Sequence, residues 1–345
     1  MQNLDWSDLG FTVRKTNGVM VSRFKDGEWS EPVVEDQNNL LLSCYAGTLH
    51  YSNSCFEGLK AFRGADGKAR IFRPDENARR MVRSAEFLDM PCPPEDLFVK
   101  MCVDYVNLNI DYLPPYGYNA SMYIRPLLIG SNEQLNLHPS TEAIFIVMGI
   151  PAGSYSGAKS LCPVTAVISR DFDRAAPNGT GSYKLSANYA PSFHAYKVAH
   201  QIGFQELLFL DPATKTRIDE FGTSNFFGVK DGTYITPLSS SVLPSITNKS
   251  LQQVALDLGY KVEKRVVPLE ELETFEEVAA CGTAVVITPV GSITDKPALR
   301  SETVSRVYEF GTPGVCGPVS RRLYETLRGV QDGTVEDAHG WCVVL

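Results

Sequence analysis

Three side chains in the second half of the sequence could together hold an aldehyde cofactor and move a proton. Lys184 lies in a glycine-rich run, Tyr189 follows five residues later, and Glu220 comes after a few dozen more. A lysine amine condenses with an aldehyde to form a Schiff base, so Lys184 suits an enzyme that uses pyridoxal 5′-phosphate. In such an enzyme the tyrosine can meet the cofactor's phenolic oxygen, and the glutamate can keep its ring nitrogen protonated. The alternative is that Lys184 is an ordinary surface charge.

Several other segments could bind a phosphate group. Ser245-Ile-Thr247 precedes an amphipathic helical pattern, and the free N–H groups at a helix start favour an anion. The alternative there is a plain N-cap formed by Thr247. Arg73, at the end of a strand pattern, is either a phosphate clamp or a surface arginine, and Thr283 lies in a Gly-Thr turn. The run Gly179–Lys184 is not a Walker loop, because a tyrosine precedes its lysine and a leucine follows it.

The elements that must position these groups alternate irregularly between strands and helices. In the first half, residues 68–73 alternate like a strand, Pro74 opens a helical pattern, and residues 120–128 and 143–148 are typical of strands. The glycine-, serine- and proline-rich run 149–157 then predicts a linker.

The second half begins with short strand patterns joined by tight turns. A helical pattern follows, with Gly259 at the position expected for its C-terminal cap. The irregular order favours two α+β lobes over a regular βαβ repeat. The predicted strands cover residues 206–210, 216–218, 226–229 and 233–235, with turns at Asp211-Pro212 and Asp231-Gly232 and a helix bearing Leu251, Val254, Ala255 and Leu258.

The composition is that of an ordinary globular chain. It has 345 residues, 43% of them hydrophobic and 21% charged, which supports a sizeable core and argues against disorder. The formal net charge of -8 gives no electrostatic footprint for nucleic acid. The eight cysteines and five histidines show neither a CxxC pair nor a metal-ligand spacing, so we expect reduced thiols and no metal. No secretory signal or membrane-spanning run is present, and we expect a soluble, cytoplasmic protein.

Several stretches, taken in order, resemble branched-chain amino acid aminotransferases of the fold-type IV pyridoxal phosphate class. The resemblance runs from about Tyr45 to Leu345 and implies an α/β (α+β) fold with two α+β domains. It implies a small N-terminal domain at 1–148, an interdomain loop at 149–158 and a large cofactor-binding domain at 159–345. The most specific stretches are His50-Tyr51, Phe56–Arg63, Tyr123–Pro126, Arg174–Gly181, Leu243–Thr247, Cys281–Ala284 and Thr288–Val290.

The resemblance also implies a role for individual residues. Lys184 resembles the Schiff-base lysine, which as a neutral amine carries a proton from the substrate Cα. The other cofactor-binding residues that it implies are Arg73, Tyr189, Glu220, Ile246, Thr247 and Thr283. The substrate-binding residues that it implies are Tyr51 (from a partner subunit), Phe56, Tyr123, Arg125, Tyr155, Thr283 and Ala284. Arg125 would accept the γ-carboxylate of glutamate, and its alternative role is a salt bridge within the fold.

The activity implied is transamination of L-leucine, L-isoleucine or L-valine with 2-oxoglutarate by a homodimer that uses pyridoxal 5′-phosphate. Two alternatives stay open. One is another fold-type IV enzyme: an aminodeoxychorismate lyase, a D-amino acid transaminase or a transaminase of a specialised metabolite. The other is a cofactor-binding protein without catalysis.

The sequence departs from the family pattern at four places. Ser186 and Ala187 replace two glycines after the lysine, where added Cβ atoms matter if the backbone needs positive φ. Asn136 stands where a glycine is common, and Ala152 stands where some members carry a large aromatic. The run Val285–Thr288 replaces the CxxC of some animal members. These changes concern the substrate range more than the chemistry.

Overall fold

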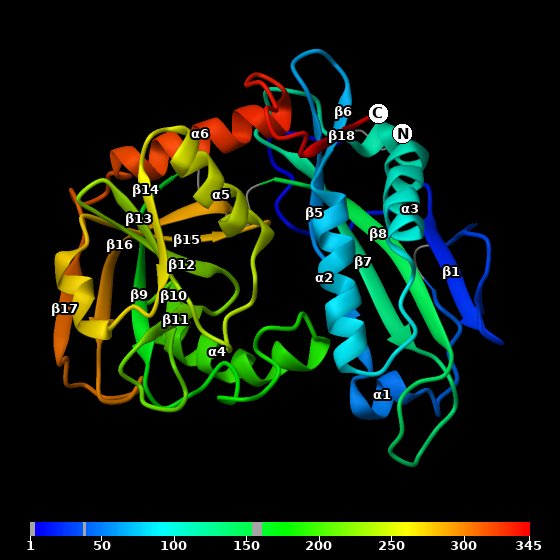
Figure 1. The fold of residues 1–345 in the computed structure, drawn as a ribbon, viewed down its shortest axis with the longest axis horizontal. Coiled ribbons are helices and arrows are strands. Elements are labelled where there is room, and N and C mark those ends of the chain that lie inside the picture. Colours follow the sequence, from blue (N-terminus) through cyan, green and yellow to red (C-terminus); the bar gives the residue numbers. More distant parts are fainter. Residues whose placement is uncertain (1–3, 37–38, 154–160) are drawn as a thin grey trace. The chain divides into compact units, whose positions relative to one another are not determined.

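The computed structural model describes residues 4–36, 39–153 and 161–345, which form two compact units (Figure 1). Unit 1 holds the described residues before the gap at 154–160, together with Tyr183–Ala187 and Gly329–Leu345. Unit 2 holds the described residues of Ala158–Ser182 and Asn188–Arg328.

Unit 1 is an antiparallel sheet covered by helices. Its strands follow the order β18-β6-β5-β7-β8-β1-β2, with β3 paired to β1 and β4 paired to β7. The strands are β1 (Val19–Lys25), β2 (Glu28–Trp29), β3 (Val33–Glu35), β4 (Ser54–Phe56), β5 (Leu59–Arg63), β6 (Ala69–Phe72), β7 (Ser121–Gly130), β8 (Ala143–Ala152) and β18 (Cys342–Val344). The helices are α1 (Gly47–Tyr51), α2 (Pro74–Phe87), α3 (Glu95–Leu108) and the 3₁₀ turn η1 (Ile110–Tyr112).

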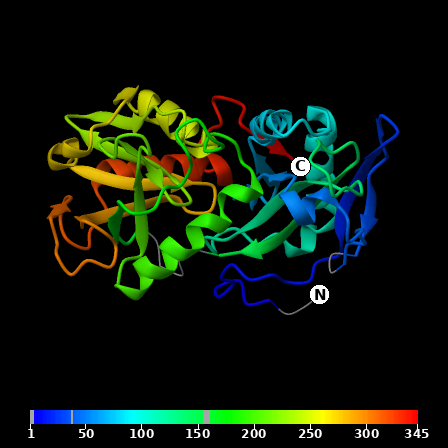
Figure 2. The ribbon, with the colours of Figure 1, turned by 90° about the horizontal axis from the view of Figure 1, so that it is seen from below.

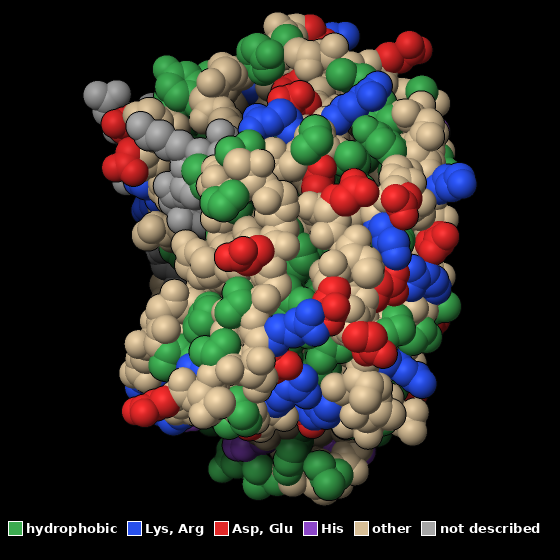
Figure 3. All heavy atoms as spheres, turned by 90° about the vertical axis from the view of Figure 1, so that its left-hand side faces the viewer, with side chains coloured by type: hydrophobic (Ala, Val, Ile, Leu, Met, Phe, Trp, Pro, Cys, Tyr) green, Lys and Arg blue, Asp and Glu red, His purple; other side chains and the backbone are tan. Residues whose placement is uncertain are grey.

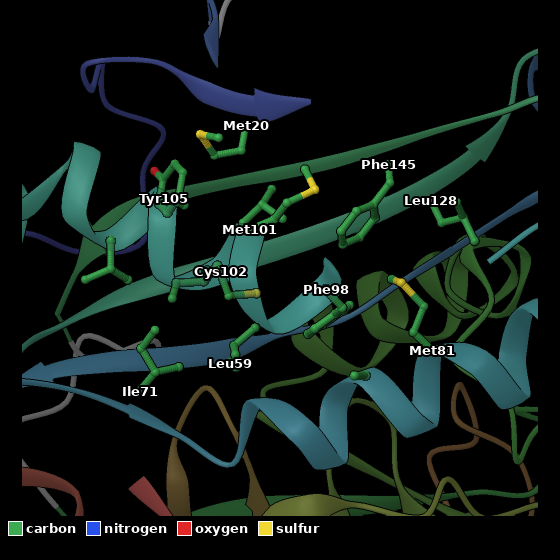
Figure 4. Packing of buried hydrophobic residues seen from close by; sticks show 14 of the residues in the cluster. Met20, Leu59, Ile71, Met81, Phe98, Met101, Cys102, Tyr105, Leu128 and Phe145 are labelled. Carbon is green, nitrogen blue, oxygen red and sulfur yellow. The ribbon is translucent and has the colours of Figure 1, made fainter. Parts of the chain in front are cut away.

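The core of unit 1 lies between α2, α3 and the sheet. Phe98 of α3 stacks on Phe145 of β8 with ring centroids 5.5 Å apart, and both side chains are fully buried (Figure 4). Met81 of α2 and Leu59 of β5 belong to the same cluster. The burial of this apolar cluster fixes α2 and α3 against the sheet whose strands carry Phe56, Tyr123 and Arg125. Burying such large side chains is strongly favourable.

Unit 2 is a mixed sheet whose central strands close into a ring. The order is β11-β10-β9-β16-β15-β12-β13-β14, β17 pairs with β16, and an additional pairing joins β11 to β12. The strands are β9 (Val164–Ser169), β10 (Glu206–Leu210), β11 (Ile218–Phe221), β12 (Asn225–Lys230), β13 (Thr233–Pro237), β14 (Lys261–Arg265), β15 (Glu277–Gly282), β16 (Val286–Asp295) and β17 (Arg306–Glu309).

The helices of unit 2 cover this sheet. In Figure 2 the green helix α4 lies along one face, where Val198 and Ala199 pack on Leu207 and Phe209 of β10. Acidic and basic side chains alternate over the face shown in Figure 3, without a large area of one sign. The remaining elements are α4 (Phe193–Gln201), α5 (Ile246–Asp257), α6 (Pro318–Asp332, which crosses the boundary between the units) and the 3₁₀ turns η2 (Ser186–Asn188), η3 (Ala190–Ser192) and η4 (Leu269–Thr274).

Several local sequence signals are confirmed, but the strand predicted at 216–218 is wrong, since only residue 218 of that range belongs to β11 (Ile218–Phe221). Strand β10 has the predicted bounds, and Asp231 and Gly232, with φ of 48° and 67°, form the turn between β12 and β13. Gly259, with φ of 86°, follows the end of α5 as expected. The two α+β lobes are also confirmed. Within the described residues, no helix has the length and apolar character needed to cross a membrane.

The alternative role of Thr247, as a plain N-cap, is wrong. The residue that caps α5 is Ser245, whose hydroxyl accepts the N–H of Asn248 at 3.2 Å. Thr247 is already inside the helix.

The predicted loop 149–158 begins too early. Residues 149–152 continue β8 and pair with β7 as far as Ser121 opposite Ala152. Gly149 is needed there for close approach, because a Cβ on it would lie 2.4 Å from the carbonyl oxygen of Tyr123. The glycine that the sequence places in a linker therefore allows the backbone of β8 to pack closely against β7. The rest of the predicted loop, from 154 on, lies outside the described residues.

The structure also divides residues 159–345 differently from the prediction. Residues 329–345 belong to unit 1, because β18 pairs with β6 over Cys342–Val344 and Leu345 donates its N–H to Ala69. Residues 183–187 belong to unit 1 as well. Both assignments depend on partners far away in the sequence.

Candidate active site

The main chain of Lys184 is fixed by unit 1 on both sides. Its N–H donates to the hydroxyl of Ser84 at 3.0 Å, and its carbonyl accepts the N–H of Phe56 at 3.1 Å. The next residue, Leu185, is buried and forms a β-bridge with Cys55. The preceding residue, Tyr183, stacks on Phe87 of α2 with centroids 4.1 Å apart. The lysine is thus half-buried in a segment docked on α2 and β4, and the surface-charge alternative does not hold.

Phe56 brings the lysine and the predicted substrate residues together. Lys184 Nζ lies 4.9 Å from the centroid of the Phe56 ring, and the guanidinium of Arg125 lies 4.5 Å from the same centroid. Arg125 also donates to the hydroxyl of Tyr123 from Nη2 at 2.9 Å. No acidic side chain of the described residues pairs with Arg125. Among these residues, the alternative role of Arg125 in a salt bridge is therefore wrong. The Lys184 amine, the Arg125 guanidinium and two aromatic rings therefore lie side by side in unit 1.

Arg73 is buried rather than exposed at the surface. It lies at the N-cap of α2 with φ of 48°, a left-handed backbone that is rare for a side chain of this size. Its guanidinium lies over the ring of Trp341 at 4.9 Å and pairs with Glu76 at 3.4 Å. Burial lowers the pKa of Arg73 from its usual value, an effect that Glu76 opposes.

One predicted substrate residue, Tyr51, lies apart from this group. Tyr51, at the end of α1, is 38% exposed and donates its hydroxyl hydrogen to the carbonyl of Leu135. It is thus held on the surface of unit 1. Tyr155 lies outside the described residues.

Glu220 is the most buried charged residue among those that the structure describes in unit 2. It is 3% exposed, and its carboxylate pairs with Arg174 at 2.7 Å. The same carboxylate accepts the side-chain N–H of Asn225 at 2.7 Å and the main-chain N–H of Leu243 at 3.0 Å. Burial raises the pKa of Glu220, and these three partners act in the opposite direction. Such a carboxylate is suited to meet a further positive group.

Glu220 and Asn225 are also the residues that close the ring of strands. They face each other in the pairing of β11 with β12. Asn225 is held in turn by Asn248 of α5 at 3.0 Å, and Asn248 accepts the hydroxyl of Tyr234 at 2.9 Å. This buried network leaves Glu220 little rotational freedom, because each amide is bonded on both sides.

Ile246 and Thr247 form the first turn of α5, and both are buried. The N–H groups of a first turn have no carbonyl partner inside the helix and carry the positive end of its dipole. This turn follows Leu243 and Ser245, so the same segment donates to Glu220 and begins α5.

Thr283, Ala284 and Val285 form the turn between β15 and β16. Val286 follows with φ of 63°, and the N–H of Ile287 donates to the carbonyl of Val285 at 2.9 Å, which makes a γ-turn. A β-branched residue with this backbone is strained. The strained residue, Val286, lies two residues after Ala284, close to the pair predicted to meet phosphate and carboxylate.

Tyr189 follows the lysine segment, where the chain has returned to unit 2. Its neighbour Asn188 donates to the carbonyl of Thr180 at 2.9 Å. The chain of unit 2 is therefore bonded to itself across the segment 183–187, which belongs to unit 1. Ser186 and Ala187 lie in the 3₁₀ turn η2 and are absent from the residues with positive φ. The two Cβ atoms that replace glycines therefore cause no backbone strain.

Comparison with known proteins decides the family. The class IV amino-transferase model matches residues 54–293 of the chain. The chain belongs to the class IV aminotransferase family. A branched-chain-amino-acid aminotransferase of Helicobacter pylori is 41% identical over 99% of this chain and 98% of its own length.

Two crystal structures are similar to this aminotransferase. The branched-chain amino acid aminotransferase of Escherichia coli gives a TM-score of 0.79 at 29% identity, covering 95% of this chain and 99% of that one. The T.th. branched-chain amino acid aminotransferase with pyridoxamine 5′-phosphate gives a TM-score of 0.78 at 26% identity, covering 96% of this chain and 99% of that one.

Sequence reasoning missed the residues of this aminotransferase that support the predicted ones. Arg174 was part of a matching stretch without a role, and it holds Glu220. Asn225 had no signal except its place in the segment after Glu220. Ser84 lies on the apolar face of α2, where a buried polar residue is a sign of a specific partner.

We predict that Arg174→Gln destabilises unit 2 by about 3–5 kcal/mol, because Glu220 is left buried without its cation. The measurement is urea unfolding of the cofactor-free protein. The pKa of Glu220 is raised by burial and rises further in this variant. The folded variant is then most stable below the ordinary glutamate pKa and loses stability as the pH rises through the folded pKa. The gap to wild type is therefore larger at pH 8 than at pH 5.

The double variant Arg174→Gln/Glu220→Gln is the control. It removes the buried charge as well, so we expect it to be more stable than Arg174→Gln and to lack the pH dependence. Equal unfolding midpoints for the single variant and wild type at pH 8 would contradict the role of Arg174.

Proposed function

We propose that this chain catalyses the pyridoxal phosphate-dependent transamination of L-leucine, L-isoleucine and L-valine with 2-oxoglutarate, giving branched 2-oxo acids and L-glutamate. The observation that carries the proposal is Lys184, an amine fixed beside Phe56 and Arg125 in a chain that is 41% identical over its length to a branched-chain-amino-acid aminotransferase. The family favours this activity over a cofactor-binding protein without catalysis.

The donor groups fit pyridoxal 5′-phosphate. The buried carboxylate of Glu220, which already accepts three donors, suits a cationic ring nitrogen. Arg73, the first turn of α5 at Ile246 and Thr247, and the hydroxyl of Thr283 would hold the phosphate, and Tyr189 would hold the phenolic oxygen. When bound, the cofactor supplies an electron sink for the charge that develops at the substrate Cα.

Lys184 would then remove the proton from the substrate Cα with its neutral amine. The main chain of Lys184 is fixed on both sides. The amine can therefore move from one substrate atom to another only by rotation about the bonds of its four side-chain methylenes. The N–H groups of the Thr283–Ala284 turn would receive the substrate α-carboxylate. Because the main chain of Lys184 is already fixed, bringing its amine to the substrate Cα costs little conformational entropy.

One pocket has to accept both an aliphatic side chain and the carboxylate of glutamate. Phe56 and Tyr123 offer aromatic surface to the first, and we propose Tyr155 and a partner's Tyr51 as further walls. Arg125, bonded to the Tyr123 hydroxyl and paired with no acid of the described residues, offers its remaining donors to the second. An aromatic pocket with one arginine thus serves both half-reactions.

We propose that two copies associate through an exposed apolar surface of unit 1, made of Tyr45, Leu49, Leu135 and Leu137, which are 53%, 61%, 61% and 82% exposed. These residues form one patch, because Gln134 donates its N–H to Tyr45 and Ala46 pairs with Glu133. Tyr51 lies in the same patch through its bond to Leu135. Large exposed apolar areas are typical of association sites. We also propose the cytoplasm as the place of action, supported by eight cysteines that form no disulfide.

We predict that the purified protein, supplied with pyridoxal 5′-phosphate, makes glutamate from 2-oxoglutarate and each of the three branched-chain amino acids. Lys184→Ala is expected to lose this activity by at least about 10⁴-fold, since it removes the covalent and the proton-transfer group together, and to lose the visible absorption of the bound cofactor. Lys197→Ala, an exposed lysine of α4, is the control and keeps both. Absence of glutamate with all three amino acids would rule out the proposed activity.

We predict that Arg125→Met lowers kcat/KM for 2-oxoglutarate by about 100-fold, because the γ-carboxylate loses a charge-assisted pair worth about 3 kcal/mol. The kcat/KM for L-leucine should change by less than about fivefold, since an aliphatic side chain needs no cation. Steady-state kinetics of both half-reactions give the two numbers. Equal losses for leucine and 2-oxoglutarate would show that Arg125 supports the fold instead.

We predict that the protein sediments as a dimer, at about twice the chain mass of 38.0 kDa. The double variant Leu49→Asp/Leu135→Asp should shift it to the monomer, because two charges in an apolar interface are costly to desolvate. Val307→Asp, at an exposed valine of β17, is the matched control. A wild-type protein that stays monomeric at micromolar concentration would refute the proposed interface.

A further inference from the structure

The contacts of Lys184 form a closed circuit through α2. From the lysine carbonyl the circuit passes to the N–H of Phe56, and then along the chain to Glu57. Glu57 binds Arg80, which lies one helical turn before Ser84, and Ser84 accepts the lysine N–H. Every member belongs to unit 1.

The ion pair in this circuit is buried and bidentate. Arg80 donates from Nε to Oε1 of Glu57 at 2.8 Å and from Nη2 to Oε2 at 2.7 Å. Glu57 is fully buried and Arg80 is 8% exposed. The N–H of Glu57 donates in addition to the carbonyl of Pro126 on β7 at 2.8 Å. A fork of two parallel bonds fixes direction as well as distance, so α2 cannot slide along β4 without breaking it.

Ser84 transmits this fixed position to the lysine. Its side chain is 1% exposed, and its hydroxyl donates to the carbonyl of Arg80 at 3.0 Å. The donation orients the hydroxyl, and the remaining lone pairs face the N–H of Lys184. A serine that bonds back within its own helix has one preferred direction. The hydroxyl is therefore a fixed acceptor and not a rotating one.

On the basis of the proposed function, we propose that Ser84 is a positioning residue for Lys184. It acts through the lysine main chain and contacts neither substrate nor cofactor in this role. Its effect belongs to the step in which Lys184 Nζ takes the proton from the substrate Cα, because that step depends on where the lysine stem begins. Substrate binding, which uses Phe56, Tyr123 and Arg125, is left nearly unchanged.

The test uses three variants. Ser84→Ala removes the acceptor, Ser84→Thr keeps a hydroxyl that bonds the same helix carbonyl, and Ser320→Ala removes a buried serine hydroxyl of α6 as the matched control. The first readout is amide hydrogen exchange of the peptide around Lys184 in the cofactor-free protein. We expect exchange about tenfold faster in Ser84→Ala, wild-type exchange in Ser84→Thr, and no change in Ser320→Ala.

The second readout is kinetic and uses L-leucine with hydrogen or deuterium at Cα. A displacement of about 1 Å costs about 100-fold in rate, so we expect kcat to fall about 10- to 100-fold in Ser84→Ala, with KM changed less than about threefold. The deuterium isotope effect on kcat should rise, because proton transfer becomes slower than the other steps. Ser84→Thr should restore kcat to within about threefold.

Each result decides the inference. Faster exchange together with a lower kcat and a larger isotope effect supports it. Unchanged exchange, an unchanged kcat, or a lower kcat without a larger isotope effect overturns it. If the wild-type protein transaminates none of the three amino acids, the proposed function fails, and exchange in Ser84→Ala against Ser84→Thr alone decides whether Ser84 positions Lys184.

Discussion

A carboxylate that water does not reach has to receive its hydrogen bonds and its countercharge from the protein, and one such carboxylate organises each unit. In unit 1 it is Glu57, whose fork with Arg80 fixes α2 against β4. In unit 2 it is Glu220, whose partners are Arg174, Asn225 and the N–H of Leu243. Removing one partner of such a pair costs far more than the pair contributes, so the surrounding strands are constrained to supply both.

The two carboxylates have different surroundings and therefore different uses. Glu57 is paired on both oxygens with the single guanidinium of Arg80. Glu220 faces donors from three separate segments and closes the ring of strands opposite Asn225. We infer that the first sets where the lysine side chain begins, whereas the second would supply the negative charge for the cofactor's ring nitrogen. The division follows from hydrogen-bond geometry and not from burial, since both groups are almost completely buried.

The sequence predicts what is local. The turn at Asp231-Gly232, the end of α5 before Gly259 and the bounds of β10 depend on φ preferences and on alternation within a few residues. The order of the matching stretches along the chain likewise predicts Lys184 and Glu220 as candidate cofactor-binding residues. Three features could not be predicted: the attachment of residues 183–187 to α2, the pairing of β18 with β6, and the close approach at Gly149. Each depends on a partner dozens to hundreds of residues away, and no local preference carries that information.

The discontinuity of unit 1 has a consequence for synthesis. Strand β6 has its partner β18 only after residues 342–344 have left the ribosome, and by then all of unit 2 has emerged. The lysine segment, which leaves unit 2 after Ser182, finds its binding site on α2 and β4 already made, since both precede it in the chain. The amine therefore reaches its working position before the sheet that surrounds its support is complete. A nascent chain then exposes the edge of β6 for the whole time needed to translate unit 2, and an unpaired edge is a site where chains aggregate.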